Sequence, residues 1–131
     1  IIEFAKKFDP QPFHIDEEAA TRSVFAGLTA SSAHTFSILI SLLGKAQPSL
    51  HFLAGLGWDE IRFPNPVRPG DELYLELAIL EKRESKSNSD RGIVRGQIHL
   101  HIIAIAHHMP RDHKAIAAVV AFAANDGRMD R

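Results

Sequence analysis

The stretch AHTFSILISLLG, Ala33 to Gly44, has the residue pattern of a helix. Its residues are apolar on nearly every side of a helix, and most of its polar members are small hydroxyl residues. Such a helix is normally buried inside a protein. It is too short to cross a bilayer, which takes about 20 apolar residues. Gly44 is a natural end for it, because glycine readily adopts the left-handed conformation of a helix C-cap. We therefore predict one long buried helix over Ala33–Gly44.

After this helix the hydrophobic periodicity changes to two, which is the period of a β-strand. Apolar residues alternate with polar or small ones over Leu73–Ile79 and over Val94–Ala104, so each stretch predicts a half-buried strand. Ile116–Ala124 is apolar on both faces, as expected of a central strand. Trp58–Phe63 is a fourth strand candidate, and we predict a connecting loop over Gln47–Gly57.

Shorter helices precede the long one. Ile1–Phe8 has the spacing of an amphipathic helix. Pro10 and Pro12 then predict a rigid turn, because proline fixes its own backbone angle. Asp16 is a suitable N-cap for a second short helix that ends near Arg22. The first helix starts without a capping residue before it, so we expect the natural protein to begin further upstream.

Together these elements predict an α+β layout in a single domain over residues 1–131, with the helices gathered on one side of an antiparallel sheet. A helix that is apolar nearly all round has to be covered. A curved antiparallel sheet wrapped around one long buried helix is the simplest solution, and this arrangement is called the hot-dog fold. Because such a sheet has free edges that must be paired or protected, we also predict a homodimer.

The composition argues against several classes of protein. The chain carries 15 basic and 16 acidic residues, a balance that does not favour nucleic-acid binding. It has no cysteine, so a disulfide framework and a thiolate zinc site are impossible. No stretch reaches the roughly 18 uninterrupted apolar residues of a membrane span. We expect a cytoplasmic protein that binds neither a membrane nor a cofactor.

The turn FDPQPFHID, Phe8 to Asp16, holds an acid and an imidazole, Asp9 and His14. The prolines between them can hold both side chains toward one point with little conformational freedom. A carboxylate and an imidazole that converge on one water molecule can orient and deprotonate it. The alternative is structural: Asp9 caps a turn, and His14 is a packed polar residue.

Small residues mark the start of the long helix. Beside Ser31 and Ser32, backbone N–H groups can be approached closely, and the helix N-terminus carries partial positive charge. Such a place can stabilise a developing oxyanion, for example the enolate of a thioester. The alternative is that one of the two serines simply caps the helix.

Histidines are the other group of candidate ligands. Five of them follow one another closely: His99, His101, His107, His108 and His113. Such clusters can bind a metal ion. Paired histidines on a solvated strand face beside a polar loop are a commoner arrangement, so we predict no metal. His34, one turn into the long helix, is expected to be a hydrogen-bonded core residue near the proposed site.

Three blocks of the chain resemble one known family. They are FAKKFDPQPFHIDEEAA, Phe4 to Ala20, then FAGLTASSAHT, Phe25 to Thr35, and NPVRPGDEL, Asn65 to Leu73. The first is similar to the pattern aromatic, alanine, then aspartate, any residue, asparagine, proline, apolar, histidine, any residue, aspartate. This is the signature of the MaoC-like dehydratase family, which includes the (R)-specific enoyl-CoA hydratases. The resemblance extends over Phe4–Leu100.

The resemblance implies a hot-dog fold and a dimer with substrate along the subunit boundary. It also implies hydration of trans-2-enoyl-CoA, or of a related acyl-carrier thioester, to the (R)-3-hydroxyacyl product. Asp9 and His14 would hold the water that adds to C3 and manage the proton that goes to C2. The N–H of Ser32 would polarise the thioester carbonyl. The neighbouring residues would line the substrate site: Gln11, Phe13, Ser31 and His34.

Two positions depart from the family pattern. Gln11 stands where the family has asparagine, and Ser32 stands where it usually has glycine. These departures keep open a second hypothesis, a non-catalytic module that binds acyl thioesters and keeps the fold. The retained Asp9 and His14 favour the enzyme. A hot-dog thioesterase is disfavoured, because that class usually has a carboxylate on the central helix and Ala33–Leu43 has none.

Overall fold

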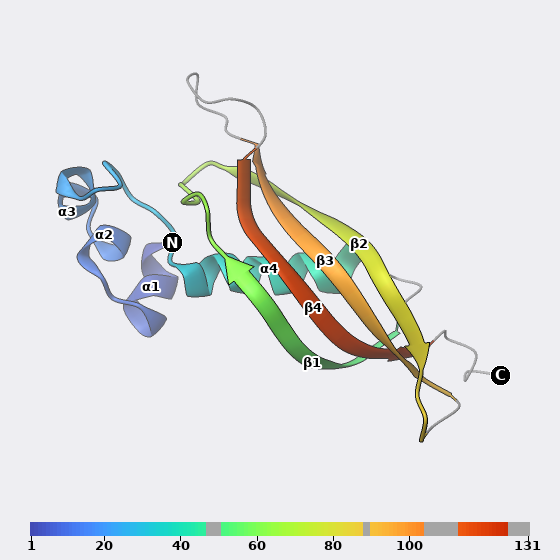
Figure 1. Cartoon of the computed structure of the whole chain (residues 1–131). Coiled ribbons are helices and arrows are strands. Elements are labelled where there is room, and N and C mark those ends of the chain that lie inside the picture. Colours follow the sequence, from blue (N-terminus) through green and yellow to red (C-terminus); the bar gives the residue numbers. More distant parts are fainter. Residues whose placement is uncertain (47–50, 88–89, 104–112, 126–131) are drawn as a thin grey trace.

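The computed structural model describes residues 1–46, 51–87, 90–103 and 113–125. Within these residues, short helices and one long helix precede an antiparallel sheet (Figure 1). The elements are α1 Ile2–Phe8, α2 Pro12–Ile15, α3 Glu17–Arg22, α4 Ser32–Ala46, β1 His51–Arg62, β2 Glu72–Glu84, β3 Gly92–Ile103 and β4 His113–Asn125. The predicted α+β class is therefore confirmed. No helix in the described part of the chain is long and apolar enough to cross a membrane.

The sheet has the strand order β1-β4-β3-β2, and every neighbouring pair is antiparallel. β4 lies between β1 and β3, which confirms the central strand predicted over Ile116–Ala124. The strands predicted from the alternating patterns are β2 and β3, although Ala104 and the polar loop that follows it lie outside the described residues. Figure 1 shows α4 lying along one face of the sheet, with α1, α2 and α3 grouped beyond the start of α4.

The core lies between α4 and the sheet. Thr35, Leu39 and Leu43 form the buried stripe of the helix, spaced by four residues as helical geometry requires. Fully buried side chains of β3 and β4 face this core, among them Ile98 and Ile116. Because these apolar residues are removed from water together, the helix is fixed along the sheet, and its first turn is placed beside the N-terminal helices.

Two predictions about α4 are wrong. The helix does not end at Gly44 but continues to Ala46, so Gly44 is a residue of the helix interior. Nor is the helix buried all round, because Ala33, Ser37 and Ile40 are exposed. The physical reason is that a sheet packed on one side covers only one stripe of a helix. The exposed stripe is mostly small or hydroxyl residues, which tolerate solvent.

The loop predicted over Gln47–Gly57 is also wrong for its described part, because β1 already begins at His51. Gly55 and Gly57 obscured the strand, since glycine has a low strand propensity. The register of β1 against β4 shifts between the two glycines and at two other places in the strand, which marks irregular pairing or β-bulges. The strand candidate Trp58–Phe63 corresponds to the second half of this longer element, which ends one residue earlier, at Arg62.

The N-terminal segment agrees with the prediction except at one place. α1 and α3 form as expected, and the Asp16 side chain accepts a hydrogen bond of 2.8 Å from the N–H of Ala19, as an N-cap does. The predicted rigid turn contains an additional one-turn helix, α2. Pro12 is its first residue, where proline loses no intrahelical hydrogen bond.

Candidate active site

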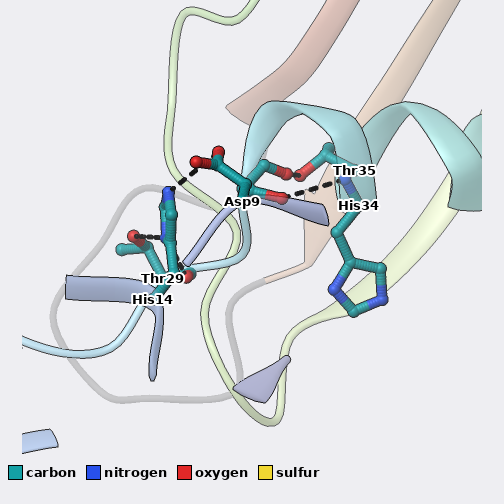
Figure 2. A network of polar contacts seen from close by, with 6 residues as sticks. Asp9, His14, Thr29, His34 and Thr35 are labelled. Atoms are coloured by element: carbon teal, nitrogen blue, oxygen red, sulfur yellow. Dashed lines mark hydrogen bonds and ion pairs between the residues drawn. The ribbon is translucent and has the colours of Figure 1, made fainter. Parts of the chain in front are cut away.

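Asp9 and His14 face each other at the junction of the first two helices (Figure 2). Asp9 is the C-cap of α1, and His14 lies in α2. The distance from His14 Nε2 to Asp9 Oδ2 is 3.8 Å. The turn between them is held by its own backbone, because the N–H of Gln11 donates to the Asp9 carbonyl and the Gln11 carbonyl accepts from the N–H of His14. The prediction that this turn brings the two groups together is confirmed.

Thr29 orients the His14 ring. His14 Nδ1 is 2.7 Å from the Thr29 carbonyl oxygen, and both residues are buried. A carbonyl oxygen only accepts hydrogen bonds, so Nδ1 carries the proton and donates it. In the neutral ring the lone pair is then on Nε2, the nitrogen that faces Asp9. Thr29 could not be identified from the sequence, because every residue has a backbone carbonyl and the residue type gives no sign of its use.

The turn of residues 65–73 braces the segment that contains Thr29. Arg68 Nη2 donates to the Phe25 carbonyl across 2.6 Å, and the Val67 carbonyl accepts from the N–H of Ala30 at 2.8 Å. Asp71 closes the turn by accepting from the N–H of Arg68 at 2.8 Å. The segment before α4 is thus held on both sides of Thr29. This gives the third sequence block a role in positioning His14.

Gly27 lets Arg68 come close. Its φ is +153°, which side-chain-bearing residues rarely adopt. A Cβ atom at this position would lie 3.1 Å from Arg68 Nη1. Glycine is therefore favoured here by the backbone conformation, and a larger residue would also push the guanidinium group away by a few tenths of an ångström.

Ser31 and Ser32 have different roles at the start of α4. Ser31 is fully buried, and its Oγ accepts a hydrogen bond of 3.1 Å from the N–H of His34. Its carbonyl accepts from the N–H of Thr35 at 2.9 Å. The capping alternative is thus confirmed for Ser31. Ser32 is the exposed first residue of α4, and no hydrogen bond within the described residues satisfies its N–H.

The other predicted site residues are arranged around the pair in different ways. The Phe13 ring packs edge-on against the His14 ring at a centroid distance of 4.5 Å, so Phe13 supports the imidazole. Gln11 is the exposed N-cap of α2. The His34 ring stacks on Phe4 at 4.3 Å, and Figure 2 shows it turned away from Asp9 and His14.

His34 was expected to be a hydrogen-bonded core residue, and the structure differs. Its Nδ1 atom is buried and has no hydrogen-bond partner within the described part of the chain. Burial lowers the pKa of His34, because the charged ring would lose its hydration. The ring is held by stacking instead of by polar contacts.

The sequence suggested that the histidines of β3 are both exposed to solvent, and for His101 this is wrong. His101 is buried, at 4% exposure, and its Nε2 lies 3.0 Å from Oε2 of Glu76. Burial lowers the pKa of His99, and the positive charge of Lys114 is the second cause that lowers it. His107 and His108 lie outside the described residues, and His113 is described only as a backbone residue of β4.

A cavity of about 280 Å³ lies between the second half of α4 and the strands β1 and β4. Its lining is apolar and includes Ile40, Trp58 and Phe122. None of the predicted site residues lines it. Ile40, the lining residue nearest the start of α4, is roughly 12 Å from Ser32 along the helix, at a rise of about 1.5 Å per residue. The cavity is therefore separate from the Asp9–His14 pair.

The pair can bind a water molecule between two acceptors. A separation of 3.8 Å is too long for a direct hydrogen bond. It does allow one water to donate to Nε2 of His14 and to the Asp9 carboxylate at once. The Asp9 side chain is 32% exposed, so water and a ligand can reach it.

The chain is similar in sequence to known proteins. The family model described as "MaoC like domain" matches residues 1–99. The uncharacterized protein YdeM of Bacillus subtilis is 34% identical over 88 residues, which cover 66% of this chain and 62% of that protein. The chain thus spans less than two thirds of that relative's length.

Solved structures are similar over nearly the whole chain. The crystal structure of the MaoC-like dehydratase from Rhodospirillum rubrum superposes with a TM-score of 0.81 and 37% identity, over 98% of this chain and 83% of that one. An unliganded R-hydratase from Pseudomonas aeruginosa gives a TM-score of 0.68 and 22% identity, over 95% of this chain and 71% of that one. The second likeness shows the fold alone. Both agree with the hot-dog fold predicted from the sequence.

Proposed function

Because the chain belongs to the MaoC-like domain family, we propose that it catalyses the reversible hydration of acyl thioesters. Water adds to a trans-2-enoyl thioester of coenzyme A, or of an acyl carrier protein, and the product is the (R)-3-hydroxyacyl thioester. The observation that carries this proposal is the Asp9–His14 pair, with Nε2 and Oδ2 3.8 Å apart and Nδ1 anchored on Thr29.

The Asp9–His14 pair holds the water and transfers the proton. One water donates to both Asp9 and His14 Nε2, which directs an oxygen lone pair at C3 of the substrate. As the C3–O bond forms, a proton passes from the water to the pair. The pair then returns a proton to C2, so that the elements of one water molecule have been added. Dehydration is the reverse of these steps.

The fixed tautomer of His14 makes this possible. Because Nδ1–H is committed to the Thr29 carbonyl, Nε2 is the nitrogen that can accept the proton. Once Nε2 is protonated, the ring becomes a cation beside the Asp9 carboxylate. This opposite charge stabilises the protonated state while the proton is in transit.

The start of α4 stabilises the negative charge that develops on the thioester carbonyl. The thioester carbonyl gains negative charge as the enolate forms. The unsatisfied N–H of Ser32 and the positive end of the helix dipole can stabilise this charge. Ser32 lies three residues after Thr29, which contacts His14. The backbone N–H is present whatever the side chain, so serine in place of glycine retains the donor.

We also propose a homodimer. β1 is an edge strand and exposes the apolar side chains of Leu53, Leu56 and Ile61. Exposed apolar residues along a strand edge favour pairing with another chain. The exposed stripe of α4 adds Ile40 to the apolar surface. Light scattering should give twice the mass of one chain, and the mass of one chain would contradict this assembly.

The activity test follows the loss of enoyl-thioester absorbance across a panel of acyl chain lengths. We expect hydration by the parent protein and a rate lower by about 10²–10⁴-fold in Asp9→Asn. Arg83→Met, a change at an exposed residue of β2, is the matched control and should be as active as the parent. An inactive parent that still binds acyl-CoA would support the alternative, a non-catalytic binding module.

A further inference from the structure

A cluster of two histidines and one glutamate lies on the sheet, on elements that do not contribute to the Asp9–His14 pair. Glu76 comes from β2, and His99 and His101 come from β3. Glu76 and His99 are direct cross-strand partners. Each of the three residues offers one ligand atom, and these atoms all lie within 4.8 Å of one another. Within the described residues this is the one such group of three or more potential metal ligands.

The cluster lies on the face of the sheet away from α4. Successive side chains of a strand point to opposite faces. Ile98 and Leu100 are fully buried in the core under α4, so His99 between them points to the other face. A site there is separate in position from the start of α4 and from the proposed hydration chemistry.

The distances between the ligand atoms are close to those of a coordination site. Oε2 of Glu76 is 3.0 Å from His101 Nε2 and 3.9 Å from His99 Nδ1. In a tetrahedral site with zinc–ligand bonds of about 2.0–2.1 Å, neighbouring ligand atoms are about 3.3 Å apart. The Glu76 side chain is 60% exposed, so its carboxylate is free to turn toward the His99 ring.

One ligand is already held in place. The side chain of His101 is 6% exposed, and its ring stacks on Tyr74 with a centroid distance of 4.5 Å and an interplanar angle of 8°. Little conformational entropy remains to be lost at this residue when an ion binds. The exposed carboxylate of Glu76 leaves the site open to solvent, so an ion can enter.

We propose that Glu76, His99 and His101 bind one divalent first-row transition-metal ion, which crosslinks β2 to β3. Two imidazole nitrogens and one carboxylate are the donor types that Zn²⁺ binds, and Zn²⁺ is the ion we assign. This inference replaces the sequence-based expectation of no metal. It does not depend on the proposed hydratase activity.

Lys114 is the group that opposes binding. Its Nζ lies 3.4 Å from Nε2 of His99. An ammonium group that donates to Nε2 keeps the ring proton on Nδ1, the nitrogen that must bind the ion. Metal binding therefore requires Lys114 to move, and its side chain is exposed and can turn into solvent. Removing the ammonium group should therefore strengthen metal binding.

Isothermal titration of the metal-free full chain with Zn²⁺ tests the proposal. We expect one ion per chain in the parent and an affinity at least about tenfold weaker in Glu76→Gln and His99→Gln, as for the loss of a group that supports a metal. Lys114→Gln should bind more tightly than the parent. His51→Asn, at an exposed histidine of β1, is the matched control and should bind as the parent does.

Thermal unfolding gives a second readout. An ion that binds only the folded state raises Tm by an amount that grows with the logarithm of its affinity, so Zn²⁺ should raise Tm of the parent and of His51→Asn by more than it raises Tm of Glu76→Gln. Because Glu76 is exposed, its replacement should leave the fold intact. The proposal is overturned if the parent does not bind Zn²⁺, or if both ligand variants bind it as tightly as the parent.

Discussion

His14 Nδ1 donates a hydrogen bond to the backbone carbonyl of Thr29 across 2.7 Å, and this contact joins the N-terminal helices to the segment that enters α4. It decides which nitrogen of the ring faces Asp9. The position of Nε2 therefore depends on the segment around Thr29, and so on the turn of residues 65–73 that braces it.

Removing the hydrogen bond from the Arg68 side chain should lower the rate of thioester hydration while the protein remains folded. Arg68→Met keeps the stem of the side chain but loses the hydrogen bond to the Phe25 carbonyl. The carbonyl of Thr29 can then shift, and a displacement of about 1 Å can cost about 10²-fold in rate. Single-turnover hydration, compared with Arg83→Met, measures this effect. An unchanged rate in folded Arg68→Met would show that the brace does not position His14.

Gly27 and Gly44 should respond in opposite ways to alanine. At Gly27 the φ of +153° and the nearby Arg68 make alanine strained, and we expect a loss of about 1–3 kcal/mol in the free energy of unfolding. At Gly44, inside α4, a Cβ meets no atom within 4 Å, so alanine should add about 0.5–1 kcal/mol. Urea denaturation measures both. Equal effects of the two changes would contradict the conformations assigned here.

The sequence predicted the fold where a periodic pattern was strong. Leu73–Ile79 and Ile116–Ala124 were identified as strands because their apolar spacing survives in the folded sheet. The first half of β1 was missed because Gly55 and Gly57 interrupt the pattern and the strand is held by pairing with β4. Burial of α4 was overestimated because composition does not say how many sides of a helix a sheet covers.

The candidate site could be predicted only in part for a similar reason. Asp9 and His14 are close in sequence, so a proline-rich turn is enough to predict their meeting. Thr29 and Arg68 act through contacts to and from the backbone across long sequence separations, and the residue types give no sign of them. Glu76 joins His101 only through the register of β2 with β3.

Stability should fall in mild acid partly because of His34. Burial lowers its pKa in the folded state, so the unfolded chain binds the proton more readily. Stability is therefore lost as the pH falls from the ordinary value of about 6.5 toward the lower folded pKa. His34→Phe keeps a ring against Phe4 but does not titrate. The urea midpoint should fall between about pH 7.5 and about pH 5.5 in both proteins, and this fall should be smaller in the variant than in the parent. An equal fall in both would contradict the assignment.

The proposed hydration depends on Asp9 and His14 acting as one unit on one water molecule. The most direct measurement is kcat/KM for hydration of a trans-2-enoyl-CoA by the parent, Asp9→Asn, His14→Gln and the double variant, each checked for folding. Each single change should cost about 10²–10⁴-fold, and the double variant should lose little more than the worse single one, because groups that act as a unit are strongly non-additive. Single variants as fast as the parent, or losses that multiply in the double variant, would contradict the account.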